Sequence, residues 1–188
     1  MEVPRYVPNL ITLARVLMAP VLAWLAATGH EMAFAWLLIA ALASDLADGL
    51  VARMFHLGTR FGALLDSVAD VLTLSVATYG IWVFHREVLR DHQLACGAAI
   101  GGGLMVCIAA LFRYGRIASF HTYVAKATAY VLGFFLATLF LFGFVSWLFA
   151  VTVALSLLGS AEELALIWYL PRWRADVRGL WWVLHERA

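Results

Sequence analysis

The sequence predicts an all-α, polytopic membrane protein with six transmembrane helices, and two observations support this prediction. Hydrophobic residues make up 64% of the 188 positions, whereas charged residues make up only 13%. Soluble domains are about 45–50% apolar and roughly 25% charged, so a soluble fold has no means of burying this much apolar surface. The apolar residues also form six runs, each close to the ~20 residues that a helix needs to cross a bilayer.

The spans follow one another with short connections, after a lead-in of residues 1–8 that contains two prolines. Pro171 is expected to end the last span, because proline cannot continue a helix. The tail 172–188 mixes Arg, Trp and Leu, which is typical of an amphipathic helix at the membrane interface. We expect one membrane domain over residues 1–188. The predicted spans are 9–27, 32–55, 61–84, 94–112, 122–144 and 146–170.

The basic residues predict the orientation. If the N-terminus is cytoplasmic, eleven of the thirteen lysines and arginines lie at or near the inner side, and Arg86 and Arg90 lie outside. An excess of Lys and Arg in cytoplasmic loops is the usual arrangement in membrane proteins. Both termini are therefore expected in the cytoplasm.

Four aspartates lie inside the second and third predicted spans. Asp45 and Asp48 are three residues apart, and Asp66 and Asp70 are four apart, so each pair projects from one face of its helix. A charge in the hydrocarbon region costs at least a few kcal/mol, which makes such residues functional candidates. The two spans form a hairpin, and the pairs are expected to meet at a similar depth near the inner surface.

Four facing carboxylates repel one another unless cations compensate them. Mg²⁺, Mn²⁺ or Ca²⁺ suits an all-carboxylate site, and two such ions are a known arrangement for displacement at phosphorus. The alternative is a set of structural Asp–Arg pairs that stabilise the hairpin. Only Arg53 lies near the four acids in the sequence pattern, so this alternative leaves most of the negative charge unexplained.

The same stretch resembles the signature of the CDP-alcohol phosphotransferase (CDP-alcohol phosphatidyltransferase) family. Residues 8–15 also resemble the start of bacterial phosphatidylglycerophosphate synthases. The signature positions are Asp45-x2-Asp48-Gly49-x2-Ala52-Arg53-x8-Gly62-x3-Asp66-x3-Asp70.

The resemblance implies a six-helix enzyme of the bacterial inner membrane, with its site facing the cytoplasm. It implies a homodimer, two divalent metal ions (Mg²⁺ or Mn²⁺), and CDP-diacylglycerol as donor; no nucleic-acid partner is expected. The GxxxG pair Gly97 and Gly101 suits either a dimer contact or packing within one subunit. The implied metal ligands are Asp45, Asp48, Asp66 and Asp70, and the implied CDP contacts are Asn9, Thr12, Gly49, Ala52, Arg53 and Gly62.

The implied reaction moves the phosphatidyl group to a hydroxyl acceptor and releases CMP. Asp70, a metal ligand, is also the expected general base: it takes the proton of the acceptor hydroxyl, which then attacks the β-phosphorus. The metals neutralise the pyrophosphate and the charge that builds on the leaving CMP.

The acceptor is less well indicated. Arg113, Arg116 and Lys126 flank the inner loop between spans four and five, which suggests an anionic acceptor such as a polyol phosphate, or simply the positive-inside bias. Glycerol 3-phosphate is our leading hypothesis. However, residues 125–128 match the phosphatidylglycerophosphate synthase pattern only in part, and Asp66-Ser67 is more like phosphatidylserine synthases. Glu162 and Glu163 are expected to pair with basic residues of this loop or the tail, or to shape the acceptor pocket.

Three alternatives stay open. The first keeps CDP-diacylglycerol but uses serine, an inositol phosphate or phosphatidylglycerol as acceptor. The second uses CDP-choline or CDP-ethanolamine as donor. The third is a metal-ion transporter built on the same aspartates, although it predicts acids spread through the membrane depth and leaves Gly49, Ala52 and Arg53 unexplained.

Overall fold

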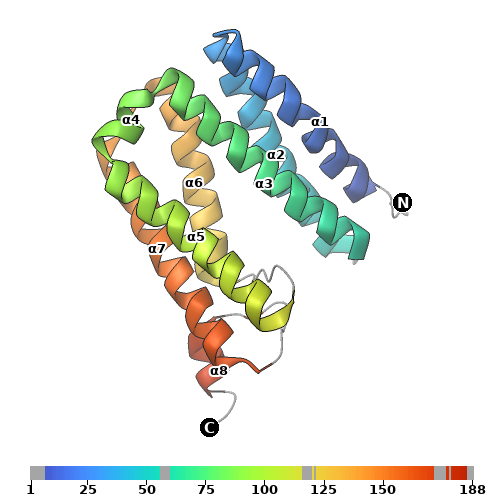
Figure 1. Cartoon of the computed structure of the whole chain (residues 1–188). Coiled ribbons are helices and arrows are strands. Elements are labelled where there is room, and N and C mark those ends of the chain that lie inside the picture. Colours follow the sequence, from blue (N-terminus) through green and yellow to red (C-terminus); the bar gives the residue numbers. More distant parts are fainter. Residues whose placement is uncertain are drawn as a thin grey trace. The chain divides into compact units, whose positions relative to one another are not determined.

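The computed structural model describes residues 7–55, 60–115, 120, 122–171, 177 and 179–185, and these contain helices but no strands (Figure 1). Side chains at 7–9, 46–55, 60–61 and 63–64 lie outside that description. The helices are α1 (Val7–Ala27), α2 (Glu31–Phe55), α3 (Arg60–Phe84), α4 (Arg86–Asp91), α5 (Gln93–Tyr114), α6 (Tyr123–Phe142), α7 (Ser146–Tyr169) and α8 (Leu180–His185).

The all-α, polytopic prediction is confirmed. The six long helices begin and end within two residues of the six predicted spans. Within the described residues, five of them are long and apolar enough to cross a membrane: α1, α3, α5, α6 and α7. The acid-bearing α2, with 25 residues, is not among them. The count of six spans and the cytoplasmic termini therefore stay predictions.

Local sequence explains where the helices end. Leu170 is extended (φ −87°, ψ 122°) because it precedes Pro171, whose ring disfavours helical geometry in the residue before it. α5 ends at Gly115 in the left-handed region (φ 67°), where its N–H donates to the carbonyl of Leu111. The short α4 lies in a segment for which no helix was predicted. The interfacial placement of the tail, which contains α8, stays a prediction.

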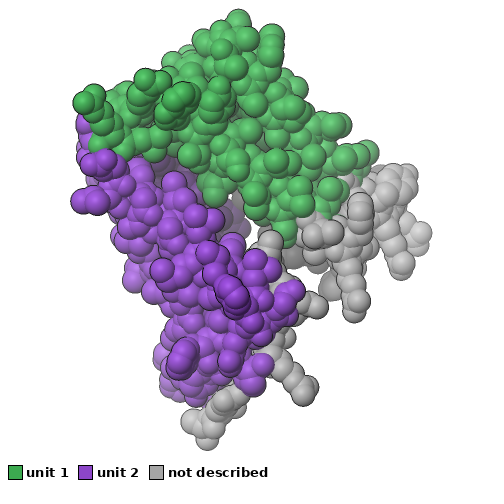
Figure 2. Space-filling view, in the orientation of Figure 1, with its two compact units in different colours: residues 1–90, 139–143 green, residues 91–138, 144–188 purple. Residues whose placement is uncertain are grey.

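The chain forms two compact units, shown in different colours in Figure 2. The first comprises residues 1–90 with 139–143, and the second comprises 91–138 with 144–188. We describe each unit by itself. The expectation of one domain over residues 1–188 stays a prediction.

In the first unit, α1 packs along both α2 and α3. The inward positions of each helix recur at alternating steps of three and four residues, the spacing of helices that cross at a shallow angle. The repeat comprises Thr12, Arg15, Ala19, Leu22 and Ala26 on α1; Phe34, Leu38, Ala41 and Asp45 on α2; and Asp66, Asp70, Thr73, Ala77 and Gly80 on α3.

Small residues on α3 allow the close approach of its neighbours. Ala77 is fully buried, and a Cβ added at Gly80 would overlap the ring of Phe34 on α2 and lie 3.2 Å from Cζ of Phe140. Phe34 is itself fully buried, with ring centroids 5.7 Å from Phe84 and 5.0 Å from Phe140. The ring therefore has no open space into which it could retreat.

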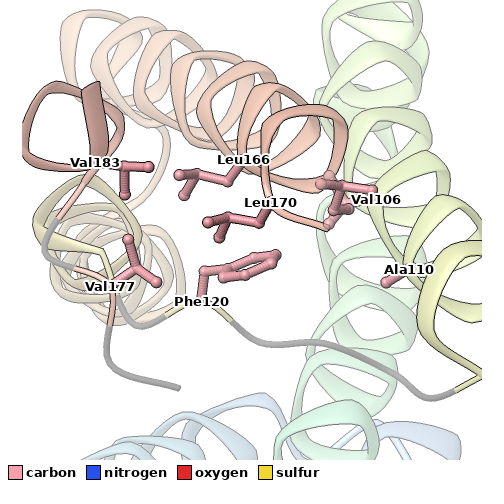
Figure 3. Close-up of a cluster of buried hydrophobic side chains, with 8 residues drawn as sticks. Val106, Ala110, Phe120, Leu166, Leu170, Val177 and Val183 are labelled. Carbon is pink, nitrogen blue, oxygen red and sulfur yellow. The ribbon is translucent and has the colours of Figure 1, made fainter. Parts of the chain in front are cut away.

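In the second unit, α5 packs against α7. A cluster of buried apolar side chains joins α5, α7, α8 and residues between them (Figure 3). Tyr114, at the end of α5, donates its hydroxyl hydrogen to the carbonyl of Leu170 at 2.9 Å, next to this cluster. The cluster comprises Val106, Ala110, Phe120, Leu166, Ile167, Leu170, Val177 and Val183.

Glu162 connects α7 to the start of α8. Its Oε1 accepts a hydrogen bond of 3.1 Å from the backbone N–H of Leu180, the first residue of α8. A carboxylate at a helix N-terminus is stabilising, because the first N–H groups lack partners within the helix. Its expected pairing with arginines is not seen among the described residues, and Arg116 and the tail arginines lie outside them.

We predict that Gly80→Ala destabilises the protein. The added methyl group overpacks the site against Phe34, which typically costs about 1–3 kcal/mol. The expected result is a lower thermal midpoint in detergent. Gly103→Ala on α5 is the matched control, since its Cβ meets nothing within 4 Å and it should leave stability unchanged or raise it slightly. Equal midpoints for the two variants would contradict the close packing at Gly80.

Candidate active site

Arg15 lies at the centre of the candidate site. It is on the inward face of α1, one turn from the buried residues Thr12 and Ala19, and its side chain is 1% exposed. A buried guanidinium is costly unless anions pair with it and accept its hydrogen bonds. This requirement is met by acids on the two neighbouring helices.

Among the described side chains, three of the predicted aspartates bind this guanidinium. Nη1 donates to Oδ1 of Asp45 on α2 and, at 3.0 Å, to Oδ1 of Asp70 on α3. Nη2 donates to Oδ1 of Asp66 on α3 at 2.8 Å. Because its planar N–H groups are fixed in a fork, one arginine can bind several carboxylates at once.

The positions of Arg15, Asp45 and Asp70 along their helices explain why these side chains lie at the same level. Arg15 lies twelve residues before the end of α1, Asp45 lies fourteen after the start of α2, and Asp70 lies fourteen before the end of α3. At ~1.5 Å per residue these separations are about 18, 21 and 21 Å. The start of α2 and the end of α3 are also joined, since Nε2 of His85 lies 3.1 Å from Oε1 of Glu31.

The cluster has a buried side and an open side. The guanidinium of Arg15 is buried, whereas the side chains of Asp45, Asp66 and Asp70 are 39%, 42% and 56% exposed. The carboxylates are therefore accessible to a ligand, and the arginine is not. Asp70 is the most accessible of the three.

The charges of the cluster do not cancel. One guanidinium faces three carboxylates, so these four side chains carry a net charge of −2 when all are ionised. Among the described side chains, ion pairing with Arg15 alone therefore leaves two negative charges uncompensated. A divalent cation would supply the missing charge.

The donor set fits a hard divalent cation. Asp45, Asp66 and Asp70 each offer an oxygen, and these atoms lie within 4.8 Å of one another. Oxygens on opposite sides of one ion are about 4.2 Å apart for Mg²⁺ and up to about 5 Å apart for Ca²⁺. The three carboxylates can therefore hold such an ion with small side-chain movements. Asp48 lies three residues after Asp45 on α2, and its side chain lies outside the described residues.

Two predicted CDP contacts lie near the cluster in the described part of the chain. Thr12 is buried one turn before Arg15 on α1, and Gly62 lies one turn before Asp66 on α3. The remaining four are on α1 and α2, but their side chains lie outside the described residues. These are Asn9, Gly49, Ala52 and Arg53.

The predicted acceptor cations belong to the second unit. Arg113 is exposed in the last turn of α5, and Lys126 is half-buried in the first turn of α6, with Nζ 5.9 Å from the ring centroid of Tyr123. Arg116 lies outside the described residues. Their role in acceptor binding stays a prediction.

Arg15 was not predicted as a site residue. Its sequence signals were its place among the inward positions of an apolar helix, and four intramembrane acids that lacked cationic partners. In the sequence, Arg15 contributed only to the predicted orientation and to the resemblance of residues 8–15. The nearby Arg53 was the expected cation instead.

The fold and the cluster together define a polytopic membrane protein with a group of partly exposed carboxylates that could hold a cation. Residues 5–158 match the sequence pattern of the CDP-alcohol phosphatidyltransferase family, and the chain belongs to this family.

Individual relatives agree with this assignment. The chain is 34% identical over 107 residues to a cardiolipin synthase (CMP-forming)/mitochondrial hydrolase fusion protein of Schizosaccharomyces pombe, covering 57% of this chain and 18% of that protein. It is 38% identical over 65 residues to a Drosophila melanogaster CDP-diacylglycerol–inositol 3-phosphatidyltransferase, covering 35% of this chain and 29% of that protein. It is 43% identical over 74 residues to a Pseudomonas fluorescens CDP-diacylglycerol–glycerol-3-phosphate 3-phosphatidyltransferase (38% of each). The matches thus span less than two-fifths of each relative, and no solved structure matches the chain.

We predict that the purified protein binds Mn²⁺ and that Asp66→Asn weakens this binding roughly tenfold or more, since changes outside the ligand shell already cost 10–100-fold. The reason is the loss of one anionic oxygen donor from a small set. Binding is measured by the loss of the free Mn²⁺ electron paramagnetic resonance signal. Asp91→Asn, at an exposed position at the end of α4, is the control and should bind as the wild type does. Equal affinities for both variants would exclude Asp66 as a ligand.

Proposed function

We propose that the protein is a phosphatidyltransferase that moves the phosphatidyl group from CDP-diacylglycerol to a hydroxyl acceptor and releases CMP. The observation that carries this proposal is the convergence of Asp45, Asp66 and Asp70 within 4.8 Å, in a chain that belongs to the CDP-alcohol phosphatidyltransferase family. The proposed setting is a homodimer in the bacterial inner membrane with the site towards the cytoplasm. The polytopic fold and the family support this setting.

The aspartates have two tasks in this proposal. Asp45, Asp48, Asp66 and Asp70 hold two divalent cations, Mg²⁺ or Mn²⁺, which supply positive charge to the pyrophosphate and to the leaving CMP. The partial exposure of Asp45, Asp66 and Asp70 supports this task, because a ligand oxygen must be accessible to the ion. Asp70 also receives the proton of the acceptor hydroxyl.

The bond changes balance in a single displacement. The acceptor oxygen loses its proton to Asp70 and forms a bond to the β-phosphorus of the donor. The bond between that phosphorus and the oxygen of CMP breaks, and CMP leaves with the electron pair. Asp70 suits the role of base because it is the most exposed of the three described aspartates.

The nucleotide is proposed to lie along the first three helices. Thr12 and Gly62 each lie one turn from a residue of the cluster, on α1 and α3 respectively. Asn9, Gly49, Ala52 and Arg53 complete the proposed CDP contacts. Glycines permit close approach of a ligand to the backbone, and an arginine suits a phosphate.

Glycerol 3-phosphate is the proposed acceptor. The names of several bacterial relatives, including the one from Pseudomonas fluorescens, specify transfer to this compound, and Arg113, Arg116 and Lys126 offer positive charge for a phosphate. The inositol 3-phosphatidyltransferase and cardiolipin synthase names among the relatives support testing other acceptors as well.

We predict that CMP release from CDP-diacylglycerol requires Mn²⁺ or Mg²⁺ and falls at least ~100-fold in Asp70→Asn, the lower range for loss of a general base. The variant keeps the size of the side chain but cannot accept the proton. CMP release is measured separately with each of four acceptors: glycerol 3-phosphate, serine, an inositol phosphate and phosphatidylglycerol. The measurement is repeated with CDP-choline and CDP-ethanolamine as donors. Asp91→Asn is the control.

The outcomes separate the alternatives. Metal-dependent release with a single acceptor would support the reaction and identify the substrate. A folded protein that releases no CMP with any donor, while still binding Mn²⁺, would refute the enzyme proposal and favour metal transport.

We predict that Lys126→Gln raises KM for glycerol 3-phosphate about 10–100-fold, the loss expected when a charge-assisted contact worth ~1.5–3 kcal/mol is removed. KM for the CDP-diacylglycerol donor should not change. The matched control is Arg90→Gln, at an exposed residue of α4. An unchanged KM for the acceptor would remove Lys126 from the acceptor site.

A further inference from the structure

Arg15 has two properties that a substrate-binding arginine would not combine. Its side chain is 1% exposed, so a substrate cannot reach the guanidinium without displacing other groups. It also binds Asp45, Asp66 and Asp70 together, each through Oδ1.

We propose that Arg15 is the internal counter-cation of the carboxylate cluster: it holds the three aspartates together when divalent cations are absent. The proposal rests on the proposed function only in taking the competing ions to be divalent metals. Arg15 thereby acts as a positioning residue, which works through the aspartates and not on the substrate.

Electrostatics gives the reason. Without Arg15, three carboxylates would face one another on two packed helices, and none of the other side chains that the structure describes places a positive charge among them. Like charges this close repel one another even at the moderate effective dielectric constant of a partly exposed site, so an uncompensated cluster would oppose the packing of the two helices. Arg15 offsets this repulsion, because all three carboxylates are attracted to the same guanidinium.

The position of Arg15 adds a structural consequence. It belongs to the inward repeat of α1 that continues through Ala19 and Leu22, and its partners lie on α2 and α3. One side chain therefore connects all three helices at the level of the site. The apolar part of the repeat holds the helices together elsewhere, whereas at this level the contact is ionic.

The decisive comparison is the thermal midpoint, measured in detergent with a chelator and again with Mn²⁺. Arg15→Met keeps an unbranched apolar stem but removes the charge, and we expect its midpoint with chelator to fall by roughly 5–15 °C. Mn²⁺ should raise the midpoint of this variant by more than it raises that of the wild type, because the ion replaces the missing charge. Arg90→Met, exposed on α4, is the control and should behave as the wild type does.

A second substitution separates a charge effect from loss of packing. Asp45→Asn in the Arg15→Met background removes one repelling carboxylate, so the double variant should be more stable in chelator than Arg15→Met alone. In the wild-type background the same change should lower the midpoint, since it breaks an ion pair. Opposite signs in the two backgrounds are the expected signature of coupling.

Other results would overturn the proposal. If Asp45→Asn lowers the midpoint in both backgrounds, Arg15 contributes packing only. If Mn²⁺ stabilises Arg15→Met no more than the wild type, the arginine does not stand in for the metal. If Arg15→Met does not fold, Arg15→Lys takes its place. A lysine ammonium lacks the fork of N–H groups with which arginine binds all three carboxylates, so we expect an intermediate thermal midpoint. A midpoint equal to that of the wild type would refute the proposal. None of these measurements depends on CMP release, so failure of the proposed enzyme activity remains a separate result.

Discussion

The ionic contact between one buried guanidinium and three carboxylates constrains the whole first unit. A buried arginine must be paired, and its pairing here requires α1, α2 and α3 to present particular residues at a common level. The inward repeats of the three helices meet this requirement, because steps of three and four residues keep one face turned to the neighbours along their length. The apolar positions of the repeat thus position the charged ones.

Side-chain size supports the same arrangement. Ala26 on α1, and Ala77 and Gly80 on α3, leave room for close approach at the end of the unit away from the cluster. Without a hydrophobic driving force between helices in lipid, close packing of small residues is a principal source of association. The ring of Phe34 fills the remaining space there.

The sequence predicted the helices well, since apolar runs of about 20 residues have few alternatives in a membrane chain. The spacings of three and four residues, which fix a helix face, also led to the expectation that the acids of α2 and α3 meet, and Asp45, Asp66 and Asp70 lie together; Asp48 lies outside the described side chains. Arg15, the partner of those acids, was not predicted. It is the single basic residue of α1, and its contact with Asp66 depends on how three helices pack. Contacts such as that of Glu162 with the N–H of Leu180 depend on a chain path that helix periodicity does not define.

The distribution of polarity within the first unit argues for chemistry at one level and against an ion path along it. From Asp45 towards the start of α2, the inward positions Ala41, Leu38 and Phe34 are apolar and fully buried. On α1, the positions beyond Arg15 are likewise apolar. A transporter needs polar groups at successive depths to replace the water around an ion. Within the described residues of this unit, the charged groups of the inward repeats are confined to the cluster. An ion held there would have partly exposed carboxylates on one side and buried, mostly apolar positions on the other, which supports the proposed site open on one side only.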